Sequence, residues 1–163
     1  MTSTEETIRE YSAAISENSS AILFSVISGK LSEGINFSDN LCRLILLIGI
    51  PYPNPYTPEH KARQTYLQES LAARGNSVDE ARRLAAEGGE DMALRAVNQA
   101  IGRAVRHKGD WACILLVDSR WEGRRVRGKL AGWIRDSVSG GSAFGEVVGK
   151  VGAFFRGKRD LKG

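Results

Sequence analysis

Three short apolar runs constrain the fold of this chain more than any other feature of its sequence. They are residues 21–27 (AILFSVI), 43–50 (RLILLIGI) and 111–117 (WACILLV). Each run has the length of a strand and lacks the alternation of a half-exposed one, which is typical of strands buried on both faces of a parallel sheet. Helical patterns lie between the runs, and parallel strands need such crossover connections. The sequence therefore predicts an α/β domain with a parallel sheet flanked by helices.

Several helices are expected around these strands. Residues 4–16 carry apolar side chains at helical spacing, and Thr57-Pro58-Glu59 opens a helix that runs to about residue 71. Shorter helices are expected around Trp133 and over residues 144–155. We interpret residues 72–89 as a surface insertion whose middle, residues 78–86, forms a short helix and which ends in Gly88-Gly89.

A helix predicted over residues 91–106 (DMALRAVNQAIGRAVR) separates its side chains into two stripes. The apolar stripe, which is expected to pack against the core, consists of Leu94, Val97, Ile101 and Val105. The nearly opposite face carries Arg95, Gln99, Arg103 and Arg106, with Gly102 between them.

The polar stripe has residue types that suit a phosphate. Arg103 and Arg106, three residues apart, form a double fork for a planar anion. Gln99 offers a donor and an acceptor to a phosphate oxygen or a water molecule, and Gly102 leaves the backbone between the arginines open. A row of arginines on a helix is more often simply a solvated face, so the spacing alone leaves both interpretations open.

Composition bounds the class of protein. The 163 residues suffice for one domain with a single core, and 42% hydrophobic with 26% charged residues is ordinary for a globular protein. The longest apolar run is only strand-sized, and the polar N-terminus is unlike a signal or transit peptide. The cytosol or the nucleus is therefore the default location.

Cysteine, histidine and charge give weaker signals. Cys42 and Cys113 are far apart and are interpreted as small core residues, and with His60 and His107 they show no ligand-like spacing, so no metal site is expected. Residues 120–163 carry 11 Lys and Arg against 4 Asp and Glu. That balance fits a phosphate-bearing partner such as nucleic acid, and it fits an ordinary solvated surface equally well.

Two stretches resemble motifs of a known family. Residues 99–106 (QAIGRAVR) resemble motif VI of superfamily 2 helicases, Q-x-x-G-R-x-x-R, and residues 29–37 (GKLSEGINF) resemble motif V of the XPD-like iron–sulfur DNA helicases. The stretches GIPYPNP, DWACILLVDSRW and KLAGWIRD are similar to the same branch. Asn36, where XPD-like relatives usually have Asp, points to the ChlR-type helicases linked to sister-chromatid cohesion.

The resemblance implies a RecA-like fold, namely the second motor domain of such a helicase, incomplete at its N-terminus. In this family ATP lies in the cleft between two RecA-like domains. Arg106 would then be the arginine finger on the γ-phosphate, with Arg103 beside it and Gln99 orienting the γ-phosphate or the attacking water.

Motif V would complement these roles. By the same resemblance, Gly34 permits close backbone approach and Asn36 hydrogen-bonds toward the nucleotide or a motif VI arginine. Lys30 and Ser32 are candidates for the DNA backbone, where contacts position a strand without identifying its sequence.

Other parts of the family's machinery do not occur in these 163 residues. Gly29-Lys30 is not a phosphate loop, because Leu31 replaces the required Ser or Thr, and no G-x-x-x-x-G-K-[ST] occurs elsewhere. The acidic metal-binding motif and the four cysteines that hold an iron–sulfur cluster in relatives do not occur either. We therefore expect ATP and Mg²⁺ to be bound mainly by a preceding domain, and the isolated chain to be inactive.

Three hypotheses about function follow. The first is the C-terminal motor segment of a nuclear ATP-dependent DNA helicase, which unwinds DNA 5′ to 3′ as in relatives, acts in DNA repair and cohesion, and works with its own N-terminal helicase domain. The second is a standalone, non-catalytic protein that binds nucleic acid or regulates a helicase. The third is a small α/β domain with an unrelated ligand. None of them involves a membrane.

Overall fold

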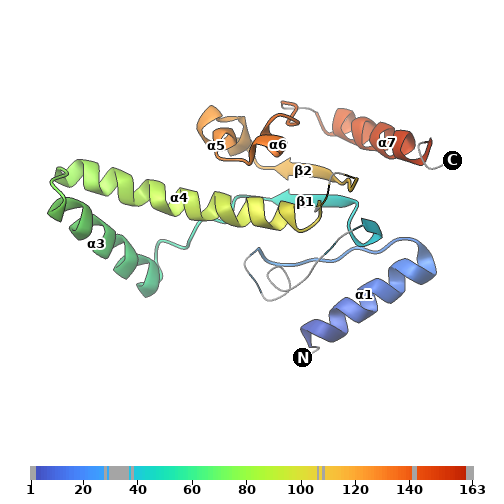
Figure 1. The fold of residues 1–163 in the computed structure, drawn as a ribbon, viewed down its shortest axis with the longest axis horizontal. Helices are drawn as coiled ribbons and strands as arrows, with labels where there is room; N and C mark the ends of the chain where they lie inside the picture. Colours follow the sequence, from blue (N-terminus) through green and yellow to red (C-terminus); the bar gives the residue numbers. More distant parts are fainter. Residues whose placement is uncertain are drawn as a thin grey trace.

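The computed structural model describes residues 3–27, 29, 37, 39–105, 107, 109–140 and 143–160. Its centre is a parallel pair of strands, β1 (Leu44–Ile48) and β2 (Cys113–Val117), in register from Leu44 with Cys113 to Ile48 with Val117. Helices flank this sheet, and the longest described one, α4 (Val78–Gly102), has its C-terminal part beside the strands while its N-terminal part extends beyond them (Figure 1). The predicted α/β class with a parallel sheet is confirmed.

Two of the three predicted strands form, and the third does not. β1 and β2 lie within the predicted ranges 43–50 and 111–117. The strand predicted over residues 21–27 is wrong, because residues 21–26 have no regular structure and Ile27 lies in a turn. No described strand pairs with this segment. Without a partner, its backbone N–H and C=O groups have no ladder to join, and Phe24 is 84% exposed.

The helical hairpin of α3 (Pro58–Ala73) and α4 differs from the prediction in one respect. α3 begins as expected, with the Thr57 hydroxyl accepting from the His60 N–H and Pro58 in the first turn. α4 begins at Val78 as expected, but it continues through Gly88-Gly89 without a break. The reason is packing, since Ala81 and Ala85 are fully buried and the Gln64 side chain of α3 donates to the Ala85 carbonyl at 3.1 Å. Whether residues 72–89 are an insertion remains a prediction.

The C-terminal end of α4 also differs from the prediction. The helix ends at Gly102 instead of continuing to Arg106, and Arg103 is its C-cap residue. The Ala104 N–H bonds to the Ile101 carbonyl at 3.0 Å, which tightens the chain into a turn toward β2. Glycine has a low helix propensity, so this position is a natural stop.

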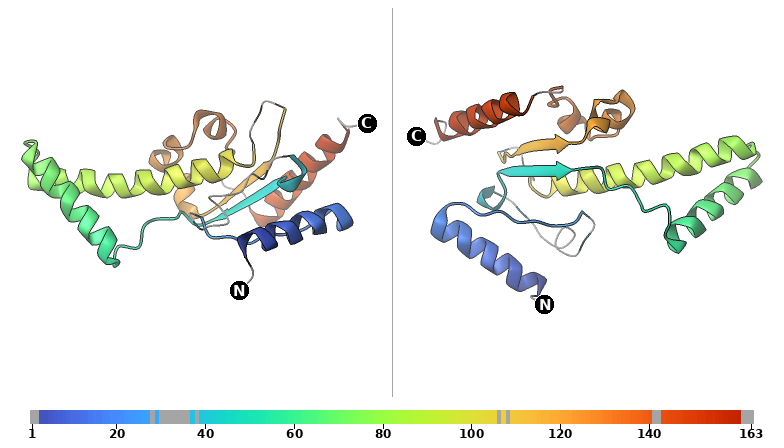
Figure 2. Two further views of the ribbon diagram at one scale, coloured as in Figure 1. Left: turned by 60° about the horizontal axis from the view of Figure 1, so that its bottom comes forward. Right: turned by 180° about the vertical axis from the view of Figure 1, so that it is seen from behind.

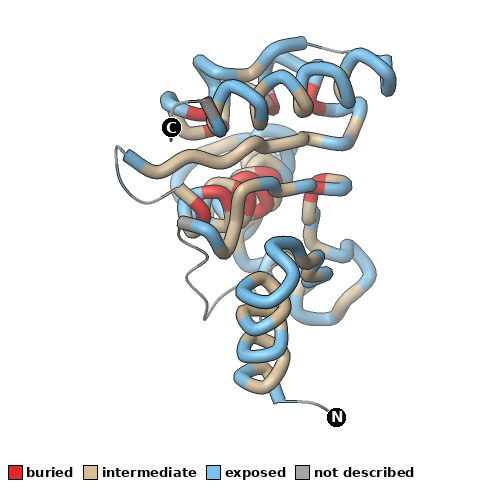
Figure 3. Tube along the Cα trace, turned by 90° about the vertical axis from the view of Figure 1, so that its right-hand side faces the viewer, coloured by how far each residue is buried: buried red, intermediate tan, exposed pale blue. Residues whose placement is uncertain are grey.

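The core lies between α4 and the sheet, as the apolar stripe of the helix predicted over residues 91–106 indicates. Leu94, Val97 and Ile101 are fully buried, whereas Val105, beyond the helix end, is half-buried. The cluster they join consists of Leu47, Ile50, Ala93, Leu94, Val97, Ile101, Trp121, Val126, Leu130 and Ile134. Figure 3 shows the buried positions concentrated around the sheet and the end of α4, with none on α1 (Thr4–Asn18).

The remaining elements surround this core. α1 has the capping box Ser3–Glu6 and ends at Ser19 in the left-handed conformation, at the break expected there. One short element, η1 (Asp39–Leu41), precedes β1, and three follow β2: η2 (Ser119–Glu122), α5 (Arg124–Gly128) and α6 (Gly132–Arg135). The last helix is α7 (Phe144–Asp160), and the short helix expected around Trp133 is α6. No helix within the described part of the chain is long and apolar enough to cross a membrane.

Different helices lie at the two ends of the parallel strands. The α3–α4 hairpin extends past the carboxyl ends of β1 and β2, whereas α1 and α7 lie toward their amino ends (Figure 2). We call the end of the sheet where β1 and β2 begin its amino edge, and the end where both strands finish its carboxyl edge.

Candidate functional site

Each of the two motifs precedes one of the two strands in the sequence, so the chain runs from each motif into the amino edge of the sheet. β1 and β2 are parallel and in register, so their first residues, Leu44 and Cys113, are adjacent. η1 leads into β1 from the motif V side, and the chain after α4 leads into β2 from the motif VI side. Two segments far apart in the sequence thus enter the sheet at one edge (Figure 2).

Gln99 and Arg103 are the two predicted site residues that the structure describes. Gln99 is exposed on the last turn of α4, and Arg103 is half-exposed at its C-cap. Neither side chain makes a hydrogen bond or an ion pair with any residue in the described ranges. A Cβ added at Gly102 would meet no atom within 4 Å, so the space between them is open, as predicted. The buried Ile101 beside them fixes the helix against the core.

The other five predicted site residues lie outside the described residues. They are Lys30, Ser32, Gly34, Asn36 and Arg106. Their assigned roles toward DNA and the nucleotide therefore remain predictions. Of the motif V stretch 29–37, the structure describes only Gly29 and Phe37, and the Phe37 ring packs edge-on against Tyr11 of α1 at 6.2 Å between centroids.

An aromatic and ionic cluster also occupies the amino edge, and the sequence did not indicate it. The Arg43 guanidinium donates to the Asp110 carboxylate and to the Trp111 carbonyl, each at 2.7 Å, and lies 4.4 Å from the centroid of the Trp111 ring. Phe154 and Phe155 of α7 pack edge-on against the same ring. Arg43 is fully engaged here, so its role is structural.

The cysteines do not form a cofactor site. Cys42 and Cys113 are both free and half-buried, less enclosed than core residues, and burial raises the pKa of each thiol. Two thiols cannot replace the four cysteine ligands of an iron–sulfur cluster. Within the described ranges, no three His, Cys, Asp or Glu side chains gather as metal ligands.

The carboxyl edge carries a second group of polar side chains. Gly49, with φ of 81°, turns the chain out of β1 toward Tyr52, and Asp118 caps η2 directly after β2. The Asp118 carboxylate accepts from the Arg120 side chain at 2.8 Å and from its backbone N–H at 2.9 Å. These bonds lower the pKa of Asp118 to about 2. Arg120 thereby lies over the Tyr52 ring, 5.0 Å from its centroid.

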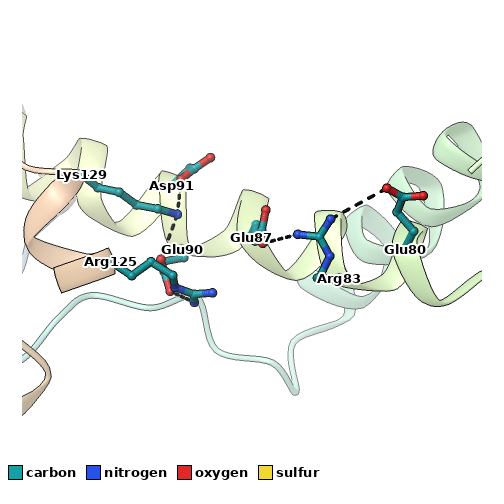
Figure 4. A network of polar contacts seen from close by, with 7 residues as sticks. All are labelled: Glu80, Arg83, Glu87, Glu90, Asp91, Arg125 and Lys129. Atoms are coloured by element: carbon teal, nitrogen blue, oxygen red, sulfur yellow. Dashed lines mark hydrogen bonds and ion pairs between the residues drawn. The ribbon is translucent and has the colours of Figure 1, made fainter. Parts of the chain in front are cut away.

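A buried carboxylate lies beside this group. Glu90 of α4 is 6% exposed, and it is paired with Arg125 and with Lys129, the latter at 2.9 Å. Lys129 also bonds to Asp91 at 2.6 Å (Figure 4). Burial raises the pKa of Glu90, but the hydrogen bonds from Lys129 and Arg125 outweigh it, so the pKa lies below its usual value.

A pocket of about 310 Å³ opens next to Glu90, at the base of the helical hairpin. It is lined by Tyr52, Pro53, His60, Gln64, Ala86, Gly89 and Glu90. One sequence feature could have indicated this pocket, because GIPYPNP and DSRW both follow strands at the carboxyl edge, where open α/β sheets bind ligands. His60 and Gln64 come from α3 and carried no such signal.

Comparison with known proteins assigns most of this chain to one family. The profile of the helicase C-terminal domain matches residues 1–137, which include both motifs and both edges of the sheet. α7 lies beyond the matched range.

Curated relatives of this chain are named ATP-dependent DNA helicase CHL1. The protein of Sclerotinia sclerotiorum is 40% identical over 98% of this chain, and that of Schizosaccharomyces pombe is 38% identical over 94%. The protein of Scheffersomyces stipitis is 45% identical over 75% of the chain. The chain spans 22%, 18% and 15% of the lengths of these three relatives, or about a fifth.

Proposed function

The chain belongs to the helicase C-terminal domain family, and we propose that it is the C-terminal motor segment of a longer ATP-dependent DNA helicase. The observation that carries this proposal is the location of Gln99 and Arg103 and the absence of described partners for their side chains. Both lie at the end of a helix anchored in the core, and neither side chain has a partner among the described residues. A helix that is held in the core and carries unpaired polar side chains at its end is suited to bind a phosphate.

The proposed chemistry is phosphoryl transfer from ATP to water. Gln99 orients the γ-phosphate or the attacking water, and Arg103 and Arg106 stabilise the charge that develops on the transferred group. Arg103 at the helix end is well placed to reach outward, since the helix stops there. This part of the chain acts by positioning and by charge, with no bond formed to the protein.

Motif V completes the proposed site on this side. Asn36 hydrogen-bonds toward the nucleotide or a motif VI arginine, and Gly34 lets the backbone approach closely. Lys30 and Ser32 contact the phosphates of the DNA strand. Both motifs lead into the amino edge of the sheet, which supports their acting together.

The rest of the nucleotide site belongs to a preceding RecA-like domain in this proposal. That domain supplies the phosphate loop and binds ATP with Mg²⁺, and the family's iron–sulfur cluster is held outside these 163 residues. Because the arginines enter from the opposite domain, hydrolysis occurs only in the closed cleft, and closure drives movement along DNA. The isolated chain is then inactive. Unwinding is 5′ to 3′, and the protein acts in the nucleus in repair and cohesion.

Substitution of the proposed arginine finger tests this function. In the longer helicase, Arg106→Ala is expected to lower the DNA-stimulated ATPase rate by roughly 10³- to 10⁵-fold while single-stranded DNA binding stays unchanged. Arg95→Ala is the matched control, because Arg95 is an exposed arginine in the same row and outside the motif. Near-normal turnover of Arg106→Ala would refute the finger role.

The size of the native product separates this proposal from a standalone protein. An antibody raised against the segment after Trp121 is used on an immunoblot of native extract. A band several times larger than 17.8 kDa is expected. A single band at the size of this chain would instead support a non-catalytic binding or regulatory protein.

A further inference from the structure

Arg43 lies where the chain passes from motif V into β1, and its two shortest hydrogen bonds reach the chain between motif VI and β2. Motif V ends at Phe37, a few residues before Arg43, and motif VI ends at Arg106, a few residues before Asp110. β1 and β2 are parallel and in register, so both segments enter the same edge of the sheet. A residue that joins these two segments can therefore fix the two motifs relative to each other.

The Arg43 side chain joins the two segments through one nitrogen. Its Nη1 donates to the Asp110 carboxylate and to the Trp111 carbonyl, each at 2.7 Å. The Asp110 Oδ1 that accepts this bond also accepts from the Trp111 N–H at 2.9 Å. One guanidinium thus holds both a side chain and the main chain of the segment that follows motif VI.

The backbone of Arg43 makes a further connection to the same segment. Its carbonyl accepts from the Cys113 N–H at 2.9 Å, directly before the pairing of the strands begins at Leu44 and Cys113. Arg43 is therefore bonded to three positions of one segment, namely Asp110, Trp111 and Cys113. Bonds to both the main chain and the side chain of a residue restrict its position more than either alone.

The ion pair of Arg43 with Asp110 is largely shielded from water. The Asp110 side chain is 0% exposed and the Arg43 side chain is 19% exposed. The guanidinium also lies over the Trp111 ring, 4.4 Å from its centroid. Charge pairs in such a place are screened little by salt, and loss of one partner is costly, whereas exposed pairs contribute little. This pair is therefore able to hold the two segments in one geometry.

We propose that Arg43 is a positioning residue for ATP hydrolysis, which fixes the chain after motif VI, and with it Arg106, relative to motif V by bonding to Asp110 and Trp111. This inference rests on the proposed helicase function, which assigns Arg106 to the γ-phosphate. Arg43 contacts neither ATP nor DNA in this proposal and acts only through the segments that it joins. Such positioning matters because a misplacement of about 1 Å can lower a rate about 10²-fold.

The first experiment measures DNA-stimulated ATP hydrolysis by the longer helicase. Arg43→Ala is expected to lower kcat by about 10²-fold, as for a displaced catalytic group. The KM for ATP and the Kd for single-stranded DNA should stay unchanged, because the phosphate loop of the preceding domain and the motif V side chains are intact. Arg43→Lys should keep most of the rate, since both bonds at 2.7 Å come from Nη1 and one ammonium group can make both.

A double variant separates positioning of Arg106 from general destabilisation. If Arg43 acts through Arg106, adding Arg43→Ala to Arg106→Ala should lower kcat no further. A merely destabilised protein would lose activity by the same factor in both backgrounds. Equal losses in the two backgrounds, or the wild-type kcat in Arg43→Ala, would overturn the inference.

Two further variants control for lost charge and for misfolding. Arg83→Ala removes an exposed arginine that pairs with Glu87 at 2.8 Å on α4, and it should leave kcat unchanged. Arg43→Met combined with Asp110→Asn removes both charges and leaves neither of them buried alone, so it serves if Arg43→Ala does not fold. The same loss of kcat is expected of this pair, and an unchanged kcat would overturn the inference.

A second experiment needs no ATP and uses the 163-residue chain. Hydrogen exchange should be roughly tenfold faster in Arg43→Ala at the Trp111 and Cys113 amides, while the buried positions Leu94 and Val97 of α4 stay protected. Unchanged exchange at Trp111 and Cys113 would overturn the inference. Near-normal turnover of Arg106→Ala refutes the finger role, whereas low turnover of Arg106→Ala with wild-type kcat in Arg43→Ala refutes only this inference, so the two proposals are distinguishable.

Discussion

Asn98 joins α4 to the segment before α6 through both ends of its amide. Its Nδ2 donates to the Lys129 carbonyl at 2.9 Å, and its Oδ1 accepts from the Ala131 N–H at 2.9 Å. The side chain is half-buried between the apolar stripe and the exposed face of the helix. This single residue therefore fixes the position of a segment more than thirty residues away.

Asn98→Ala is expected to lower the free energy of unfolding by about 1–3 kcal/mol, because two backbone groups lose their partner. Urea denaturation followed by far-UV circular dichroism measures the change. The matched control is Gln99→Ala, whose exposed side chain bonds to no described residue and should cost at most about 0.5 kcal/mol. Equal losses in the two variants would contradict the assigned role.

Asp118 makes stability depend on pH in a defined window. Its pKa is lowered to about 2 by the hydrogen bonds from Arg120, against about 3.9 for an unfolded aspartate. A lowered pKa stabilises the folded state above the unfolded value, and that stabilisation is lost as the pH falls through the folded value. Wild type should therefore be more stable than Asp118→Asn, and the difference in their unfolding free energies should be largest above pH about 5.

That difference should then narrow as the pH falls from about 4 to about 2, which urea midpoints measured across this range would detect. Arg120→Ala should show the same narrowing, because it removes the partner that lowers the pKa. A difference that stays constant down to pH about 2 would mean that Asp118 does not act through its charge.

The helices and strands follow from the sequence where local signals and packing agree. The buried stripe of α4 was predicted from its period, and Pro58 after Thr57 marked the start of α3. The expected break at Gly88-Gly89 failed, because burial of Ala81 and Ala85 against α3 outweighs the low helix propensity of two glycines. Local sequence does not contain that information.

The roles of the predicted site residues stay predictions. The family motifs predict Gln99 and Arg103 as site residues, and both lie at one end of α4 with no side-chain partner among the described residues. The Tyr52–Arg120 pair and the pocket were not predicted, since α3 contributes His60 and Gln64 only through the geometry of the hairpin. Contacts that depend on a crossing angle between helices have no local sequence signature.

α7 is attached to the rest of the molecule through aromatic rings. Phe154 and Phe155 pack on Trp111, with centroids 5.8 and 6.0 Å away, and Lys158 lies 5.7 Å from the same ring. The opposite end of the helix, at Phe144, is largely exposed. The helix lies beyond the range that the family profile matches.

The double substitution of Phe154 and Phe155 by Ala is expected to release α7. Its amides should then exchange hydrogen at least tenfold faster, while those of β1 and β2 remain protected, since local opening needs only the local contacts to fail. Hydrogen exchange with mass spectrometry measures both regions. Phe144→Ala should leave exchange in α7 unchanged, and equal acceleration throughout the molecule would indicate global destabilisation instead.

Several large apolar side chains in the described part of the chain are exposed to solvent. Ile22, Phe24 and Val26, in the segment predicted as a buried strand, are each about four-fifths exposed. Leu46 and Ile48 of β1 are also exposed. Extended apolar patches on a protein surface mark contacts with other protein or ligand surfaces. The segment has strand-like composition but lacks a strand to pair with among the described residues.

This surface should make the isolated chain associate with itself and bind hydrophobic dyes, despite a net charge of +4 that opposes association. Sedimentation velocity is expected to give an average mass that rises with concentration, and Ile22→Ser with Phe24→Ser should return it toward that of a monomer. Val78→Ser, a single exposed apolar residue at the start of α4, is the control. A monomer at all concentrations would contradict this prediction. It would show that the exposed apolar side chains of residues 21–27 do not drive association.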